Sequence, residues 1–267
     1  MKKFSEEEQN YICSHYLSNC NIQFLSKKFN VSDYRIKTVL KNHDIQIVSR
    51  YEEIMKIRFP RNSDIFERID SKEKAYWLGF LYADGGIVKN VLRVNLSEKD
   101  EAHLYKLKQF LECSRHEIKH NDKTVGEKTF PIVYLSLGDK KLISDLERLG
   151  CVPRKSLILK FPTSSQVPRE FLSHFIRGYF DGDGSVSVYK KKNRIQISFT
   201  GTFNFLESLK TELKNPMLKI ENKEKFGVLH FDGKEQVYSI YKYLYQNSYS
   251  DIELERKKKI FQDYYNI

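Results

Sequence analysis

The amino-acid sequence predicts an α+β protein in which two αββαββα-type repeats form a pseudo-two-fold domain, preceded by a small all-α helix-turn-helix domain. Three observations lead to this prediction. The stretch WLGFLYADGG at residues 77–86 is echoed by IRGYFDGDGS at residues 176–185, with apolar, small and acidic residues in the same order. The segments after the two copies predict the same succession of strands and helices, which indicates a duplicated unit. Residues 1–45 instead show helical periodicity only.

Composition narrows the function classes. The 267 residues are 40 % hydrophobic and 13 % aromatic, which is typical of a globular protein. The 46 Lys and Arg residues outnumber the 35 Asp and Glu residues and give a formal net charge of +11. An excess of this size favours a polyanionic partner, because each phosphate that is neutralised releases counterions.

Targeting and metal-binding patterns are missing from the sequence. No apolar run approaches the roughly 20 residues of a membrane span, so no membrane partner is expected. The first ten residues, MKKFSEEEQN, lack the apolar core of a signal peptide, and we expect an intracellular protein. Cys13, Cys20, Cys113 and Cys151 have no CxxC spacing, which predicts reduced thiols rather than a zinc site.

The N-terminal domain is predicted over residues 1–50. Ser5 and Glu8 form a capping-box pattern that starts a first helix. Two short helices then follow, separated at Asn30, and Ser32 is expected to cap the second of them. That second helix, residues 33–43, resembles the recognition helix of a helix-turn-helix DNA-binding unit, although a helical hairpin with solvated lysines has the same pattern. The residues expected to contact DNA are Arg35, Lys37 and Lys41.

A linker containing Pro60 is predicted over residues 51–70, and the two repeats over residues 71–160 and 161–267. In the first repeat a motif helix ending at Asp84 precedes a strand at 91–97, a helix at 101–111, a strand at 131–139 and a helix at 140–150. In the second, a motif helix ending at Asp183 precedes a strand at 194–200, a helix at 204–213, a strand at 226–233 and a helix at 235–245. Each repeat closes on a basic segment, with Lys155 and Lys257 at corresponding places.

Small residues recur four apart in both motif helices, Gly79 with Ala83 and Gly178 with Gly182. Residues four apart lie on one face of a helix, and small side chains there let two helix backbones approach closely. We therefore expect the two motif helices to pack against each other along the pseudo-two-fold axis.

That packing brings Asp84 and Asp183 together at two helix C-termini. The position is unfavourable for acids, because the helix macrodipole is negative there and the two carboxylates repel each other. A divalent cation removes both problems, and Mg²⁺ prefers carboxylate and water oxygens. Metals held in this way can activate water and stabilise the leaving oxygen of a phosphodiester. The pair predicts metal-dependent phosphodiester chemistry.

The two motifs and the repeats around them resemble the single-chain form of the LAGLIDADG homing endonuclease family, over about residues 71–267. The resemblance implies two sheets that form a saddle over the DNA major groove. It also implies that Asp84 and Asp183 bind Mg²⁺, for which Mn²⁺ can substitute, and cut both strands. The adjacent backbone carbonyls of Ala83 and Gly182 are expected to complete the metal site.

The resemblance implies further residues at the rim of each site. Lys155 and Lys257 correspond to the family's basic residues near the scissile phosphate, and we expect a catalytic role for both. Glu98 falls near the position that orients water after the first strand. The motif's earlier acidic position is Tyr82 in the first copy and Asp181 in the second, and no metal role is expected for Asp181.

DNA contacts are expected from strand residues that face away from the core, because Arg, Asn and Gln can pair with purine edges in the major groove. These are Arg93, Asn95 and Ser97 in the first repeat and Arg194, Gln196 and Ser198 in the second. The loop at residues 188–194 adds phosphate contacts from Lys190, Lys191 and Lys192.

The function predicted from these features is a sequence-specific, divalent-metal-dependent double-strand DNA endonuclease of the kind used in intron homing, acting as a monomer on double-stranded DNA. Two alternatives on the same scaffold stay open: a DNA-binding transcription regulator that does not cleave, and a maturase that binds intron RNA. The two retained aspartates favour cleavage, since a pure binder has no use for two carboxylates that repel each other.

Overall fold

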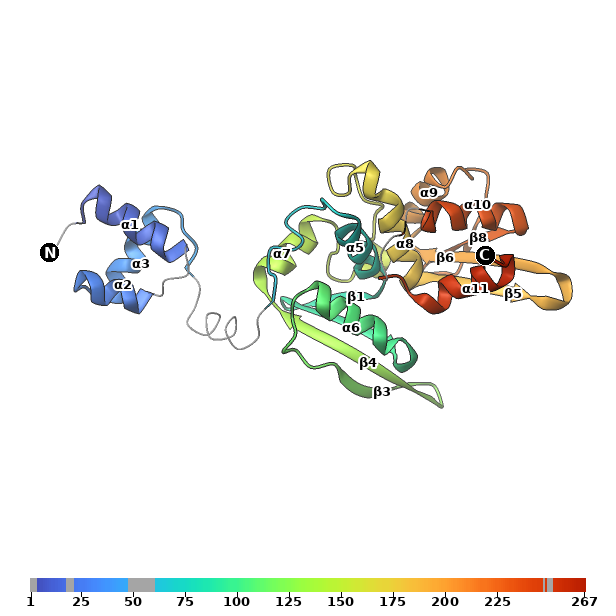
Figure 1. The fold of residues 1–267 in the computed structure, drawn as a ribbon, viewed down its shortest axis with the longest axis horizontal. Helices are drawn as coiled ribbons and strands as arrows, with labels where there is room; N and C mark the ends of the chain where they lie inside the picture. The colour runs from blue at the N-terminus through green and yellow to red at the C-terminus, as the bar shows by residue number, and fades with distance from the viewer. Residues whose placement is uncertain (1–3, 18–21, 48–60, 247, 249–251) are drawn as a thin grey trace. The chain divides into compact units, whose positions relative to one another are not determined.

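A computed structural model of the chain describes residues 4–17, 22–47, 61–246, 248 and 252–267, and the remaining residues, Cys20 among them, lie outside this description. The chain divides into two compact units, residues 1–58 and 59–267 (Figure 1). In the described part of the chain no helix has the length and apolarity needed to cross a membrane.

The smaller unit contains three helices, α1 (Glu6–Leu17), α2 (Ile22–Phe29) and α3 (Asp33–Asn42). The predicted capping box is confirmed, since the Ser5 amide donates to the Glu8 carboxylate at 3.0 Å and the Glu8 amide donates to Ser5 Oγ at 3.2 Å. The core of the unit consists of buried aliphatic side chains from all three helices: Ile12, Ile22, Leu25, Ile36, Val39 and Leu40.

The turn between α2 and α3 is formed as expected, with Asn30 at a φ of 53° in the left-handed region. Ser32 occupies the N-cap position of α3, but its side chain makes no capping hydrogen bond. The expected side-chain cap is therefore wrong, although the helix starts at the predicted residue.

The larger unit contains two four-stranded sheets of the same topology. The first has the order β1-β2-β4-β3 and the second β5-β6-β8-β7. All neighbouring strands are antiparallel. The strands of the first sheet are β1 (Gly85–Val88), β2 (Val91–Ser97), β3 (Lys119–Val125) and β4 (Lys128–Gly138). Those of the second are β5 (Gly184–Tyr189), β6 (Arg194–Gly201), β7 (Ile220–Asn222) and β8 (Gly227–Asp232). The predicted α+β fold class with two such repeats is confirmed.

Helices cover one face of each sheet and meet in the middle of the unit (Figure 1). The helices of the first half are α5 (Lys72–Asp84), α6 (Glu101–Phe110) and α7 (Lys140–Arg148). Those of the second half are α8 (Leu172–Asp183), α9 (Phe203–Glu212), α10 (Lys234–Tyr245) and α11 (Glu255–Tyr265). One continuous core joins the two halves, and the side chains of Trp77, Tyr76, Phe175 and Phe180 are buried in it.

Several strands differ from the sequence-based expectation. The αββαββα type implies four strands in each repeat, but no residues were assigned to the edge strands. β1 is only four residues long and begins with two glycines, and every residue of β3 is exposed, so neither sequence carries a clear apolar pattern. The expected loop at 188–194 is partly wrong, because β5 runs to Tyr189. A short 3-10 turn, Lys190–Lys192, then leads to Asn193 in the left-handed region.

The predicted linker is wrong for its second part. Ile65, Phe66 and Ile69 are buried in the core of the larger unit, and Arg61 forms an ion pair of 2.6 Å with Asp139. Residues 61–70 therefore belong to that unit, because burying three large apolar side chains stabilises their place in its core. Residues 51–60 lie outside the described residues.

Candidate active site

The two motif helices, α5 and α8, pack backbone against backbone. A Cβ atom built on Gly79 would lie 1.9 Å from the Phe175 carbonyl oxygen, and one on Gly178 would lie 1.9 Å from the Tyr76 carbonyl oxygen. No side chain fits at that distance, so both positions require glycine. The close approach expected from the small residues is present on both sides of the pseudo-two-fold axis.

The same approach brings the ends of the two helices together. A Cβ on Gly182 would lie 2.2 Å from the Ala83 Cβ and 3.0 Å from Asp84 Oδ2. Burial raises the pKa of Asp84 to about 7, and the charge of Asp183 adds to this increase. Burial also raises the pKa of Asp183. The two carboxylates thus share a site that disfavours their negative charge.

Two lysine ammonium groups at the ends of α5 and α8 favour the ionised form of these carboxylates. Lys155 donates to the Ala83 carbonyl at 2.7 Å, at the end of α5. Lys257 donates to the carbonyls at the end of α8, at 2.8 Å to Phe180, 2.7 Å to Asp181, 2.6 Å to Gly184 and 3.4 Å to Gly182. Each ammonium group satisfies helix C-terminal carbonyls and complements the negative end of the dipole.

Burial of the Lys257 ammonium lowers its pKa to about 8, although the neighbouring carboxylates favour the charged form. Both lysines lower the pKa of Asp84 and Asp183, against the larger effect of burial. The two predicted lysines and the two predicted aspartates are therefore gathered in one place. Of the two backbone carbonyls expected as metal ligands, that of Ala83 accepts from Lys155 at 2.7 Å and that of Gly182 has a longer contact of 3.4 Å with Lys257.

The position two residues before each motif aspartate makes a contact that the sequence did not reveal. The Tyr82 hydroxyl donates to the Leu149 carbonyl at 2.5 Å. Asp181, two residues before Asp183 as Tyr82 is before Asp84, accepts from the Leu254 amide at 2.8 Å. Both contacts attach a motif helix to the segment that carries the lysine of the same half.

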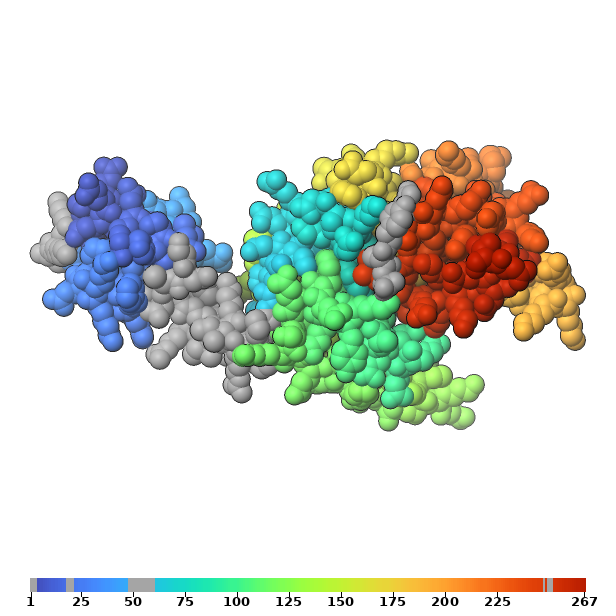
Figure 2. Space-filling view, in the orientation of Figure 1, coloured from blue at the N-terminus to red at the C-terminus, as the bar shows by residue number. Residues whose placement is uncertain are grey.

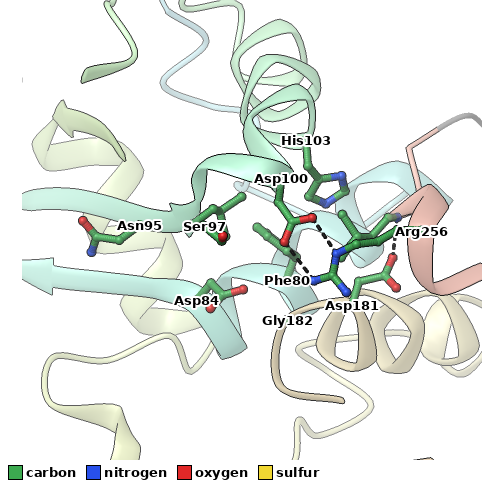
Figure 3. Close-up of a pocket in the computed structure, with 11 residues that line it drawn as sticks. Phe80, Asp84, Asn95, Ser97, Asp100, His103, Asp181, Gly182 and Arg256 are labelled. Atoms are coloured by element: carbon green, nitrogen blue, oxygen red, sulfur yellow. Dashed lines mark hydrogen bonds and ion pairs between the residues drawn. The ribbon is translucent and has the colours of Figure 1, made fainter. Parts of the chain in front are cut away.

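A small pocket of about 150 Å³ opens beside Asp84 (Figure 3). Arg256, from the second half, reaches across it to Asp100 of the first half and donates from both its Nε and Nη2 atoms, at 2.6 and 2.8 Å. Asn95 and Ser97 also line this pocket. Nothing in the sequence marks Asp100 and Arg256 as partners, because 156 residues separate them.

The pocket beside Asp183 is larger, about 350 Å³, and Lys155 lines it. Thr202 occupies its wall and donates to the Leu159 carbonyl at 2.5 Å. Among the pocket's residues, Thr202 stands where the first half has Asp100, since both immediately precede the helix that follows the central strand. The two pockets are therefore built on the same pair of motif helices but differ in the residues that line them.

Glu98 does not reach the pocket of Asp84. It belongs to a short 3-10 turn, Glu98–Asp100, and its carboxylate lies 3.6 Å from His120 Nδ1. In the second half β6 passes to α9 through Thr202 alone, so this turn has no counterpart there. The turn explains why the sequence shows no matching acidic residue in the second repeat.

The DNA-contacting residues predicted on the two central strands lie on the faces of the sheets opposite the helices. Alternation along β2 leaves Arg93, Asn95 and Ser97 exposed, and alternation along β6 leaves Arg194, Gln196 and Ser198 half-buried. Lys190, Lys191 and Lys192 are exposed at the β5–β6 turn. In the smaller unit Lys37 and Lys41 are exposed on α3, whereas Arg35 is half-buried against the Phe4 ring at 5.3 Å.

The part of the chain that is described holds no group of three His, Cys, Asp or Glu side chains placed to bind a metal ion. The candidate metal ligands at the helix ends are the carboxylates of Asp84 and Asp183. Such a set fits Mg²⁺, which is usually bound through one or two carboxylates together with water and substrate phosphates.

Comparison with known proteins shows which families and folds this chain resembles. Residues 170–206, which span α8, β5 and β6, match the family described as LAGLIDADG-like domain. The homing endonuclease I-WcaI, solved bound to its DNA recognition sequence, superposes with a TM-score of 0.54 over 82 % of this chain and 97 % of that chain, at 13 % identity. The meganuclease I-SmaMI bound to uncleaveable DNA is a weaker match, with a TM-score of 0.46 at 14 % identity over 72 % of this chain and 87 % of that chain.

A curated relative, a probable translation initiation factor IF-2 from Methanocaldococcus jannaschii, is 27 % identical over 204 residues; the match covers 69 % of this chain and 16 % of that protein. The resemblance to the LAGLIDADG homing endonuclease family is confirmed: residues 170–206 are similar to a LAGLIDADG-like domain, and the chain has the fold of the homing endonuclease I-WcaI.

Proposed function

We propose that this chain is a sequence-specific, Mg²⁺-dependent endonuclease that cuts both strands of DNA, of the kind used in homing. The observation that supports this most is the pair of carboxylates, Asp84 and Asp183, held at two helix ends by backbone-to-backbone packing. Their environment raises the pKa of both. A fold selected for stability alone does not retain two such acids, so their presence favours a bound cation and a reaction.

Asp84 and Asp183 would hold the divalent cation, Mg²⁺ or Mn²⁺. When bound, the cation would supply activation of water and charge stabilisation at a phosphodiester. The ammonium groups of Lys155 and Lys257 are placed to keep the carboxylates ionised and to attract the phosphate group. Tyr82 and Asp181 orient the segments that carry these lysines.

Double-stranded DNA is the proposed partner of the outer faces of both sheets. Arg93, Asn95 and Gln196 present side chains that can read base edges. Lys190, Lys191 and Lys192, together with Lys37 and Lys41 of the smaller unit, add phosphate contacts that extend the footprint. Both halves of the site belong to one chain, which favours action as a monomer. A DNA substrate implies a DNA-containing compartment of the cell.

The test starts from a randomised duplex library, from which the protein selects bound DNA in EDTA. The selected duplex is then incubated with the protein in Mg²⁺, and the products are sequenced. The expected result is a double-strand break at a fixed position, made only with the metal. The Asp84→Asn/Asp183→Asn double variant should bind the duplex and leave it intact.

Asp122→Asn is the matched control, because Asp122 lies exposed on β3 and should leave cleavage unchanged. Selection of a duplex that neither protein cuts in any divalent metal would overturn the proposal and indicate a DNA-binding regulator. Preference for structured RNA over every duplex would indicate a maturase.

A further inference from the structure

The outer face of the first sheet carries a further cavity, of about 520 Å³, which shares Asn95, Leu96 and Ser97 with the pocket beside Asp84 and extends from there along β3 and β4. It lies between the end of β2 and the half of the β3–β4 hairpin nearest the turn, since Val125 is the last residue of β3. This long hairpin runs out past α6 (Figure 1). Five apolar residues line the cavity, Leu96, Val125, Phe130, Pro131 and Ile132, and Val125, Phe130 and Ile132 alternate onto the outer face. Val125 is 58 % exposed and Phe130 48 % exposed, so this apolar surface is open to a ligand.

Three polar side chains that can donate hydrogen bonds border this apolar surface. Asn95, Ser97 and Lys123 line the same cavity. Pairing of Lys123 with Phe130, and of Ser97 with Ile132, places these side chains on one face of the sheet. An amide, a hydroxyl and an ammonium therefore border an apolar floor.

The charge of this face favours an anionic partner. Among the residues of β1 to β4 that alternate onto it, none is Asp or Glu, whereas Arg93, Lys119, Lys123 and Lys128 are cationic. A face with this charge is complementary to the DNA backbone. In the major groove of DNA, the one apolar group on a base edge is the C5-methyl group of thymine.

We propose that this cavity recognises a thymine in the first half of the DNA target, a step that rests on the proposed function. Phe130 and Ile132 contact the C5-methyl group. Lys123 donates to the neighbouring O4 atom, because an ammonium group has donors and no acceptor and so cannot pair with the amino group of cytosine. The cavity is a specificity-determining site for one base pair.

The second half lacks this site. Its hairpin is short, with β7 covering Ile220–Asn222 against the seven residues of β3, Lys119–Val125. Its outer face carries Glu221 and Asp232, and these carboxylates are paired with His230 and Arg194. A thymine requirement from this source is expected in one half-site only.

The experiment uses the full chain and the duplex selected from the randomised library in EDTA. Wild-type protein should select one invariant thymine in the half-site bound by the first sheet. Replacing that thymine with deoxyuridine removes only the methyl group and should weaken binding about fivefold, the effect of losing about one buried methyl contact. Phe130→Ala should lose the preference for thymine over deoxyuridine and still bind.

Tyr105→Ala is the matched control, because Tyr105 is an aromatic residue with similar exposure, 51 %, on helix α6 rather than on the outer face. It should keep the preference. A Phe130→Leu variant, which retains an apolar contact, should keep most of it, and circular dichroism confirms that each variant is folded.

A selected site without an invariant thymine, or equal affinity for thymine and deoxyuridine, overturns the proposal and leaves the proposed function intact. Equal binding of 5-methyldeoxycytidine at that position overturns the assignment to thymine and the role of Lys123. Failure to select any duplex overturns both the cavity's role and the proposed function.

Discussion

The two halves of the larger unit have the same strand order and pack through equivalent motif helices, but many of the side chains at the pockets and on the outer faces differ. Gly79 and Gly178 meet the opposite helix at the same distance, and Lys155 and Lys257 cap corresponding helix ends. The backbone frame is thus conserved between the halves because its close contacts admit no alternative residue.

Away from that frame the halves have diverged. The first half has an additional 3-10 turn whose Asp100 binds Arg256, whereas the second has Thr202 at that place. The outer face of the first sheet carries cations without acids, but Arg194 on the second sheet is paired with Asp232. The two halves of this duplicated unit therefore share their backbone arrangement, while the charges and side chains that would determine DNA affinity and specificity differ between them.

The largest expected effect is a loss of stability when the close packing of α5 against α8 is disturbed. Gly79→Ala and Gly178→Ala should each destabilise the protein by about 2–4 kcal/mol, because the new methyl group would overlap a backbone carbonyl and push the helices apart. Chemical denaturation measures the change. Gly86→Ala is the matched control, since a Cβ there lies 3.6 Å from the nearest atom, at an ordinary contact distance. Unequal losses at Gly79 and Gly178 would contradict the symmetry of the packing.

The next prediction concerns the paired carboxylates and pH. The pKa of Asp84 is raised to about 7 in the folded state, so ionisation of this group destabilises the fold progressively as the pH rises from about 4 to 7. Asp84→Asn should therefore raise the free energy of unfolding at pH 8 by about 1–2 kcal/mol, a value discounted because the carboxylate is partly exposed. The gain should disappear near pH 4.

Thermal denaturation across this pH range, without metal, measures the effect. Added Mg²⁺ should stabilise the wild-type protein and not the Asp84→Asn variant, because a ligand stabilises only the fold that binds it. A loss of stability in the variant at pH 8 would show that Asp84 is not strained by its surroundings.

A smaller effect on stability is expected for the ion pair between Asp100 and Arg256, which is present in the pocket beside Asp84 and not in the pocket beside Asp183. Asp100→Asn should destabilise the protein by about 1 kcal/mol, since it weakens a partly buried, two-point ion pair between the halves. A double-mutant cycle with Arg256→Gln isolates the pairwise energy. The same cycle between Asp100 and Arg154 serves as the control and should give no coupling, because Arg154 is exposed elsewhere in the first half.

The smallest expected effect concerns the two outer faces. Asp232→Asn releases Arg194 for phosphate contact and should raise DNA affinity about two- to threefold at low salt, with a steeper salt dependence. Asp122→Asn is the control on the first sheet, because Asp122 alternates with Lys123 and lies on the opposite face. Titration of labelled duplex at several salt concentrations measures both variants, and equal gains would remove the proposed difference between the faces.

The sequence alone determined the features that depend on near neighbours along the chain. The repeated motifs, the helix ends at Asp84 and Asp183, the capping box at Ser5 and the alternation along β2 follow from periodicity and from local backbone hydrogen bonding. The small residues at Gly79 and Gly178 also predicted which helices meet, since small side chains on one helix face have few other uses. Edge strands such as β3 could not be predicted in this way, because they are held by pairing with β4 and by no apolar pattern of their own.

Only the tertiary structure decided which distant groups become partners. The contacts of Lys155 with Ala83, of Lys257 with the end of α8 and of Arg256 with Asp100 join residues 72 or more positions apart. The physical reason is that a charged side chain specifies how strongly it needs a partner, but only the folded backbone determines which carbonyl or carboxylate lies within reach. The placement of the thymine cavity follows the same rule, because its floor and its rim come from three different strands.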